Sequence, residues 1–178
     1  MKTALIFPGQ GSQYIGMGLE FYECYSESKE VYNQLNYTLD RDLSNLIFFG
    51  NESELSETQN SQPAIMATSI AIFKALVSEN LLPAGSFQAV AGHSLGEYSA
   101  LVANGGIDFN DSVRLLKIRS KAMQDSMPVG TGGMIALIGC ERDIIDNAIK
   151  SASQDGKIYL ANDNAEGQIV LSGEINAI

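Results

Sequence analysis

The residues with the clearest chemical potential are five consecutive ones, Gly92-His93-Ser94-Leu95-Gly96, which match the G-x-S-x-G pattern of a nucleophile elbow. In such an elbow a serine stands on a sharp strand-to-helix turn, where its hydroxyl can attack a carbonyl carbon. The glycines leave room for the turn, and the backbone N–H of Leu95 is placed to stabilise the oxyanion that forms. The pattern predicts acyl chemistry at Ser94. A tight turn that contains a serine by chance is the alternative.

The segments on either side of Ser94 favour the chemical interpretation. Residues 87–91 form a short run with the length of a buried strand, and the residues after Leu95 are rich in Leu, Glu, Tyr and Ala, which is typical of a helix. The five-residue pattern is weak evidence by itself. Its strand–turn–helix context makes a functional serine the favoured interpretation.

A second glycine-rich loop, Phe-Pro-Gly-Gln-Gly-Ser-Gln at residues 7–13, follows a predicted strand at residues 3–7. The spacing of Gly9, Gly11 and Gly16 does not give G-x-G-x-x-G, and no Lys-Ser/Thr pair follows, so a phosphate-binding loop is not indicated. Two interpretations remain open. The loop brings its backbone N–H groups close to a ligand, or it is an ordinary strand-to-helix turn.

Arg119 occupies an unusual position in the predicted helix 112–127. On a helical wheel it falls within the apolar arc, whereas Arg114, Lys117 and Lys121 share the opposite side. A guanidinium that is always charged is costly on a core-facing stripe unless an anion meets it. The anion is either a structural carboxylate, with Glu97 as the candidate, or a carboxylate on the substrate.

The remaining elements follow from apolar periodicity and from turn signals. A helical pattern covers residues 19–39, a short capped helix covers 42–50, and residues 51–58 resemble a polar surface loop. A long helix opens at Ser61-Gln62-Pro63 and is apolar almost all round, so we expect it to be buried with Gln62 within reach of the site. The pattern in the last part of the chain predicts a β-α-β-β order, with elements at residues 134–139, 143–153, 157–161 and 168–172 and a turn at 162–167.

Composition excludes several classes of function. The 178 residues are 45 % apolar and carry 21 acidic and 11 basic side chains, a net charge of −10, so nucleic-acid binding has no electrostatic basis. Cys24, Cys140 and the single histidine have no metal-ligand spacing, and we expect no metal and no bound cofactor. Pro8-Gly9 interrupts the apolar N-terminal run before it could be a signal or a membrane span. We expect a cytoplasmic protein with no membrane association.

The ordered set of motifs resembles malonyl-CoA:acyl carrier protein transacylase, an acyltransferase of fatty acid biosynthesis. The resemblance extends along the whole chain. Its motifs are Phe-Pro-Gly-Gln-Gly-Ser-Gln at 7–13, Ser-Gln-Pro-Ala at 61–64, Gly-His-Ser-Leu-Gly-Glu-Tyr-Ser-Ala at 92–100, Arg-Ser-Lys-Ala-Met-Gln at 119–124, Gly-Thr-Gly-Gly-Met at 130–134, and residues 162–173.

The resemblance implies a role for particular residues. Ser94 would be the nucleophile, Gln10 and Leu95 would supply the oxyanion-hole N–H groups, and Arg119 would bind the malonyl carboxylate. Three polar residues would lie along the coenzyme A channel, although they also suit a surface hairpin: Asn162, Asn164 and Gln168. The implied substrates are malonyl-CoA and the phosphopantetheine thiol of acyl carrier protein. Arg114, Lys117 and Lys121 could favour phosphopantetheine or the acidic carrier protein, or they simply form a solvated helix face.

The resemblance also implies a fold and a general base. The expected fold is α/β, with an α/β-hydrolase-like core containing a parallel sheet (residues 1–128) and a partial ferredoxin-like subdomain (129–178). The family uses a histidine located after the second subdomain as general base. The one histidine of this sequence is His93, in the elbow itself. We therefore expect the chain to correspond to the N-terminal portion of the enzyme and to have little activity alone. A non-catalytic thioester- or carrier-binding module and a serine esterase are the alternatives.

Overall fold

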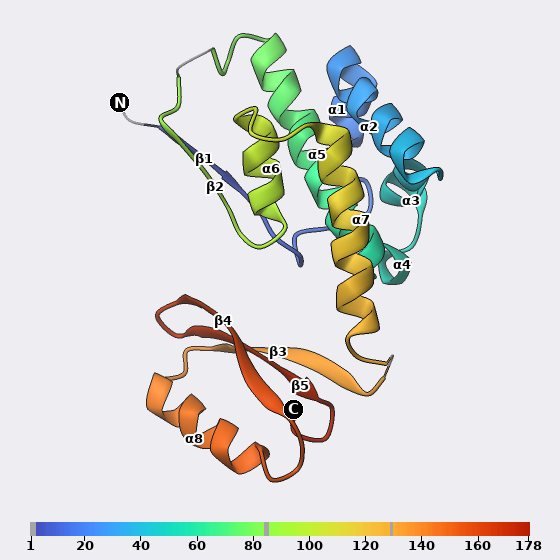
Figure 1. Cartoon of the computed structure of the whole chain (residues 1–178). Coiled ribbons are helices and arrows are strands. Elements are labelled where there is room, and N and C mark those ends of the chain that lie inside the picture. The colour runs from blue at the N-terminus through green and yellow to red at the C-terminus, as the bar shows by residue number, and fades with distance from the viewer. Residues whose placement is uncertain (1–2, 84–85, 129) are drawn as a thin grey trace. The chain divides into compact units, whose positions relative to one another are not determined.

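The computed structural model describes residues 3–83, 86–128 and 130–178 (Figure 1). The chain divides into two compact units, Met1–Met123 and Gln124–Ile178. Each unit has its own cluster of buried apolar side chains.

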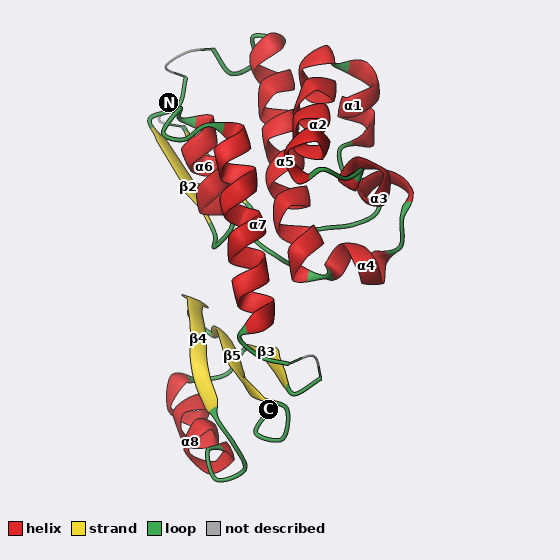
Figure 2. Ribbon diagram, turned by 45° about the vertical axis from the view of Figure 1, so that its right-hand side comes forward, coloured by secondary structure: helices red, strands yellow, loops and turns green. Residues whose placement is uncertain are grey.

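The first unit is built around one long helix, α5 (Thr58–Ser78). It lies between the N-terminal helices on one side and α6 (Gly96–Ala103) with α7 (Phe109–Asp125) on the other (Figures 1 and 2). The N-terminal helices are α1 (Leu19–Cys24), α2 (Ser26–Leu39), α3 (Leu43–Phe49) and α4 (Glu52–Ser56). Most of α5 from its first turns onward is buried, as its nearly uninterrupted apolar sequence predicts.

A small parallel sheet positions the chemistry. Strands β1 (Ala4–Phe7) and β2 (Ala89–Gly92) pair in parallel, with Phe7 opposite Gly92 at the carboxyl end of both strands. Helix α6 packs against both strands. In a parallel sheet the loops that follow the carboxyl ends lie at one edge, so the glycine-rich loop after β1 and the elbow after β2 become neighbours.

Several helix boundaries in this unit differ from the predicted ones. The helical pattern 19–39 is two helices that meet at Tyr25, which has an extended backbone. The expected loop 51–58 contains the short helix α4, because Asn51 caps it by accepting a hydrogen bond from Glu54 N–H. The predicted cap at Asp42 is present and begins α3: its carboxylate accepts from Asn45 N–H, and this bond lowers the pKa of Asp42.

Helix α5 begins three residues before the predicted start, so Pro63 lies inside it rather than in its first turn. Proline has no N–H, and the carbonyl four residues earlier, on Gln59, loses its helical donor. Arg41 supplies a replacement, because its Nη2 donates to Gln59 O at 3.3 Å. A long-range contact of this kind allows the helix to extend past a signal that normally marks its start.

The buried face of α7 is displaced from the arc that the wheel predicted. Val113, Leu116 and Ser120 are buried, whereas Leu115 and Ile118 are 43 % and 66 % exposed. Hydrophobicity alone does not distinguish two overlapping arcs, and small serines permit close packing that an apolar count cannot detect. Arg119 is nonetheless partly buried, as expected.

The second unit is a three-stranded antiparallel sheet with one helix. Its strands β3 (Gly132–Ile138), β4 (Ile158–Ala165) and β5 (Gln168–Glu174) are ordered β3-β5-β4, and α8 (Arg142–Ala152) contributes Ile145 to the core beneath them. The turn expected at 162–167 is shorter than predicted. β4 continues to Ala165 through two register shifts, so Asn162 and Asn164 lie in a strand.

The architecture is therefore mixed α/β, with a small parallel sheet in one unit and a three-stranded antiparallel sheet in the other. This agrees with the predicted fold class at that level of detail. Within the described ranges, no helix has the length and apolar character needed to span a bilayer.

Candidate active site

Ser94 stands on a strained turn between β2 and α6. Its backbone has φ 55°, a left-handed conformation that few non-glycine residues adopt and that costs about 1–3 kcal/mol. A Cβ at Gly96 would lie 2.5 Å from Phe7 O, and one at Gly92 would overlap the backbone of Gly96. Only glycine fits at both positions. The geometry is that of a nucleophile elbow, as the pattern predicted.

The glycine-rich loop after β1 packs directly against the elbow. Phe7 O accepts a hydrogen bond from His93 N–H at 3.1 Å, and a Cβ on Gly9 would lie 2.5 Å from His93 Nδ1. The His93 ring therefore lies against Gly9. Ser12 Oγ donates to Gly9 O at 2.8 Å, which holds the loop in shape around Gln10. The loop therefore packs closely against the elbow, and the interpretation that its N–H groups serve a ligand stays a prediction.

The N–H of Leu95 is free to serve a ligand. Gly96 N–H and Glu97 N–H donate to the carbonyl oxygens of His93 and Ser94, at 2.9 and 3.1 Å. Leu95 N–H, at the N-cap of α6, has no backbone acceptor in the described part of the chain. N–H groups at a helix start lack partners within the helix and suit a developing negative charge.

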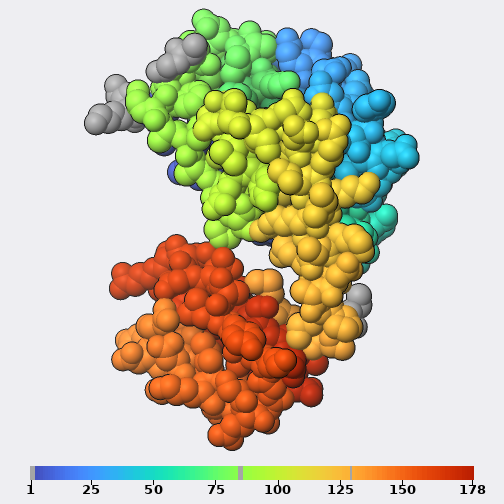
Figure 3. Space-filling model, in the orientation of Figure 1, coloured from blue at the N-terminus to red at the C-terminus, as the bar shows by residue number. Residues whose placement is uncertain are grey.

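Arg119 reaches Ser94 from α7, and α7 lies beside α6 in the space-filling view (Figure 3). Its Nη2 donates to Ser94 Oγ at 2.8 Å, and its Nη1 donates to Gln62 Oε1 at 2.6 Å. Neither partner is charged. Over the residues that the structure describes, Arg119 has no carboxylate within ion-pair distance, so Glu97 is not its counter-ion. The alternative of a structural ion pair with Glu97 is wrong.

Gln62 completes the cluster from the start of α5. Its side chain is fully buried, and its Nε2 donates to Met123 Sδ at 3.3 Å while Oε1 faces Arg119. Three elements far apart in sequence thus bring a nucleophile, a cation and a neutral acceptor together. The sequence suggested that Gln62 lies near the site but did not indicate its contact with Arg119.

The three residues expected along a coenzyme A channel belong to the second unit. Asn162 and Asn164 lie in β4, and Gln168 begins β5. Their role in binding coenzyme A near Ser94 stays a prediction. On α7, the expected basic residues Arg114, Lys117 and Lys121 are exposed, and Arg114 pairs with Asp111 at 2.7 Å.

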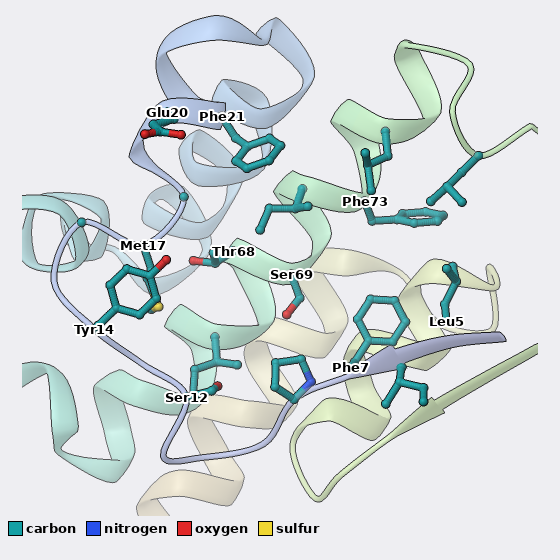
Figure 4. A pocket seen from close by; sticks show the side chains of 18 residues that line it. Leu5, Phe7, Ser12, Tyr14, Met17, Glu20, Phe21, Thr68, Ser69 and Phe73 are labelled. Carbon is teal, nitrogen blue, oxygen red and sulfur yellow. The ribbon is translucent and has the colours of Figure 1, made fainter.

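A pocket of about 550 Å³ is lined by residues of β1, of the segment that follows it and of α5 (Figure 4). Leu5, Phe7, Met17 and Phe73 are among the mainly apolar residues that line it, with Thr68 and Ser69 from α5. Ser94, Gln62 and Arg119 are not part of its wall, so we assign it no role in the chemistry at Ser94. Among the described residues, no group of three or more His, Cys, Asp or Glu side chains could hold a metal ion.

A serine on a strained strand-to-helix turn, an N–H group at the start of the following helix and a neighbouring cation are features expected where acyl groups are transferred through serine. The family model for the acyl transferase domain matches residues 4–178, and the chain belongs to that family. The resemblance to malonyl-CoA:acyl carrier protein transacylases that the motifs indicated is confirmed by its relatives.

The malonyl CoA-acyl carrier protein transacylase of Bacillus subtilis is 41 % identical over 99 % of this chain, and that of Haemophilus influenzae is also 41 % identical over 99 %. The crystal structure of an acyl-carrier-protein-S-malonyltransferase from Bartonella henselae superposes with a TM-score of 0.92 at 43 % identity, over 99 % of this chain and 56 % of that one. A malonyl-transacylase solved in complex with its type II PKS acyl-carrier protein gives 0.90 at 38 % identity, again over 99 % and 56 %. The chain spans about half the length of the curated relatives it matches, 55 % and 56 %.

Proposed function

We propose that Ser94 accepts a malonyl group from coenzyme A and passes it to the phosphopantetheine thiol of acyl carrier protein. The observation that carries the proposal is the hydrogen bond from Arg119 Nη2 to Ser94 Oγ, at 2.8 Å. This bond brings a guanidinium that has no carboxylate partner among the described residues next to the proposed nucleophile, where a malonyl thioester would carry its free carboxylate. The names of the relatives support this choice of substrates.

In the first half-reaction Ser94 Oγ attacks the thioester carbonyl carbon, and the carbonyl oxygen becomes an oxyanion. The N–H groups of Leu95 and Gln10 stabilise that oxyanion, which is the role expected of donors fixed before the reaction begins. The C–S bond then breaks, coenzyme A leaves as the thiol, and malonyl-Ser94 remains. In the second half-reaction the carrier thiol attacks the ester, the C–O bond breaks and Ser94 recovers its proton.

Each half-reaction needs a base for the proton of the attacking group, and a positioned base contributes about 10²–10⁴-fold. The family resemblance assigns this base to a histidine after the second subdomain, whereas the one histidine in this sequence is His93. We therefore expect acylation by this chain to be slow. It should still occur, because Ser94, Leu95 and Gln10, the proposed nucleophile and oxyanion donors, all belong to the first unit.

The second unit is proposed to assist in binding coenzyme A. Asn162, Asn164 and Gln168 would contact it, as the resemblance implies. The strand order β3-β5-β4 with α8 on the sheet supports a partial ferredoxin-like subdomain, and the first unit supports the α/β-hydrolase-like core. The proposed domains are residues 1–128 and 129–178.

Intact-mass spectrometry of the 178-residue chain after prolonged incubation with malonyl-CoA tests the proposal. We expect one malonyl adduct, which Ser94→Ala abolishes and Ser53→Ala, at an exposed position in α4, retains. An adduct that persists in Ser94→Ala would contradict the assignment. Binding of malonyl-CoA with no adduct would favour the non-catalytic module, and equal reaction with simple esters would favour an esterase.

A further inference from the structure

We infer that Gln62 is a positioning residue that holds the Arg119 guanidinium beside Ser94 without neutralising it, and that this selects acyl groups bearing a carboxylate. The inference rests on the proposed function and deepens it. It begins with two contacts of one buried amide: Oε1 accepts from Arg119 Nη1 at 2.6 Å, and Nε2 donates to Met123 Sδ at 3.3 Å.

The direction of this amide follows from the chemistry of its neighbours. A guanidinium has only donors, so the amide group that faces Arg119 must be the carbonyl oxygen. The NH₂ group then faces the thioether sulfur of Met123, which is a weak acceptor. Both ends of the amide are engaged, and the side chain is fully buried. Gln62 therefore has one orientation, and that orientation fixes Arg119.

The neutrality of Gln62 matters as much as its position. A glutamate here would make the same hydrogen bond and would also cancel the guanidinium charge. Gln62 and Ser94 instead give a partly buried cation hydrogen bonds without a charge, and no carboxylate among the described residues lies within ion-pair distance of it. A substrate carboxylate supplies the counter-charge when it binds. An acyl group without a carboxylate leaves the Arg119 charge without a counter-charge. This difference in how the Arg119 charge is compensated is the basis of the selectivity.

The location of Gln62 suits a fixed acceptor. It precedes Pro63 in α5, where the neighbouring residues Ser61 and Ala64 are fully buried, so little movement is open to it. Arg119 comes from α7, whose buried residues belong to the same core. The pair is therefore held by packing on both sides, which lowers the entropy lost when the guanidinium orders around a carboxylate.

The test uses the 178-residue chain with free malonate as the probe and the neutral diamide, malonamide, as its matched control. Binding is followed by ¹⁵N NMR of the Arg119 side chain. Gln62→Met removes the acceptor and keeps the positive charge, so we expect malonate affinity to fall about threefold to tenfold. Gln62→Glu keeps the acceptor and adds a charge, so we expect a loss of about tenfold or more. Malonamide binding should change little in either variant.

The order of the two variants separates this inference from a purely structural role. If Gln62 only supports the fold, Gln62→Glu, which keeps the hydrogen bond, should bind malonate better than Gln62→Met. Gln59→Glu places the same charge on an exposed position of α5 and should bind like the unaltered chain. Should Gln62→Glu not fold, an unchanged malonate affinity in Gln62→Met would still overturn the inference.

Failure of the inference is distinguishable from failure of the proposed function. Absence of any malonate effect on Arg119 in the unaltered chain overturns the inference, whatever the mass spectrometry of Ser94 shows. Malonate binding with the expected order of variants, but no malonyl-Ser94, supports the inference and contradicts only the acyl transfer.

Discussion

A serine hydroxyl that accepts a hydrogen bond from a guanidinium has one of its lone pairs occupied. In the structure Arg119 holds Ser94 Oγ in this way, at 2.8 Å. A substrate carboxylate would compete with Ser94 Oγ for this Nη2 donor, because a charged acceptor makes the stronger hydrogen bond, while Nη1 stays with Gln62. Substrate binding and release of the nucleophile would then be one event at the scale of two side chains.

Replacing Arg119 should therefore affect substrates differently. We expect Arg119→Ala to slow malonyl adduct formation by the equivalent of about 1.5–3 kcal/mol, the worth of a charged hydrogen bond, and to slow acetyl adduct formation much less. Intact-mass time courses with malonyl-CoA and acetyl-CoA measure both. Arg114→Ala, which removes an exposed arginine of the same helix, is the control. Equal losses with both substrates would show that Arg119 is structural.

At the scale of elements, the three-stranded sheet of the second unit has a central strand and two edges. β5 pairs with β3 on one side and β4 on the other, whereas β3 pairs only with β5 among the described strands. In an antiparallel pair alternate residues direct their N–H groups away from the partner. The outer row of β3 is thus open to water or to another strand, and Met134 and Ile138 on this strand are 59 % and 76 % exposed.

Hydrogen exchange should reflect this arrangement. We expect about half of the β3 amides to exchange quickly in the isolated monomer, while Ile169 and Leu171 in β5 exchange slowly because both sides of that strand are paired. Amide exchange measured by NMR at low protein concentration resolves the two strands. Slow exchange at every β3 amide in a verified monomer would mean that another segment covers the edge.

At the scale of the whole molecule, the two units have separate cores. The first is large and helical, and the second depends on a few buried side chains, among them Ile145, Ile158, Ile169 and Leu171. A unit of this size buries little apolar surface and has little stability to lose. The candidate cluster of Ser94 and Arg119 lies entirely in the first unit.

We therefore expect Ile145→Ala to unfold or strongly destabilise the second unit, by about 2–5 kcal/mol, and to leave the first unit folded. Amide NMR spectra of the variant should keep the signals of residues 3–83 and lose the dispersion of those in β3, β4 and β5. Malonyl adduct formation at Ser94 in the Ile145→Ala variant gives a second measure of whether the first unit stays folded. Collapse of both sets of signals together would show that the two units fold as one.

Local sequence determined the parts of this protein whose physics is local. The glycines around Ser94 predict the elbow, because no side chain fits there, and apolar periodicity predicts the buried helix α5. Arg119 could be singled out because a charge on an apolar stripe needs a partner. These inferences depend only on residues within a few turns of each other.

Tertiary structure alone decided what depends on packing between distant segments. Ser94, Gln62 and Arg119 meet because the turn after β2, α5 and α7 bring their side chains within hydrogen-bond distance, and no periodicity within one element encodes that meeting. The buried face of α7 was selected by the surface it contacts, and β4 continued through Asn162 because β5 offered it hydrogen-bond partners. The sequence predicted only that Gln62 lies within reach of the site. Its positioning role could be inferred only from its contact with Arg119 in the structure.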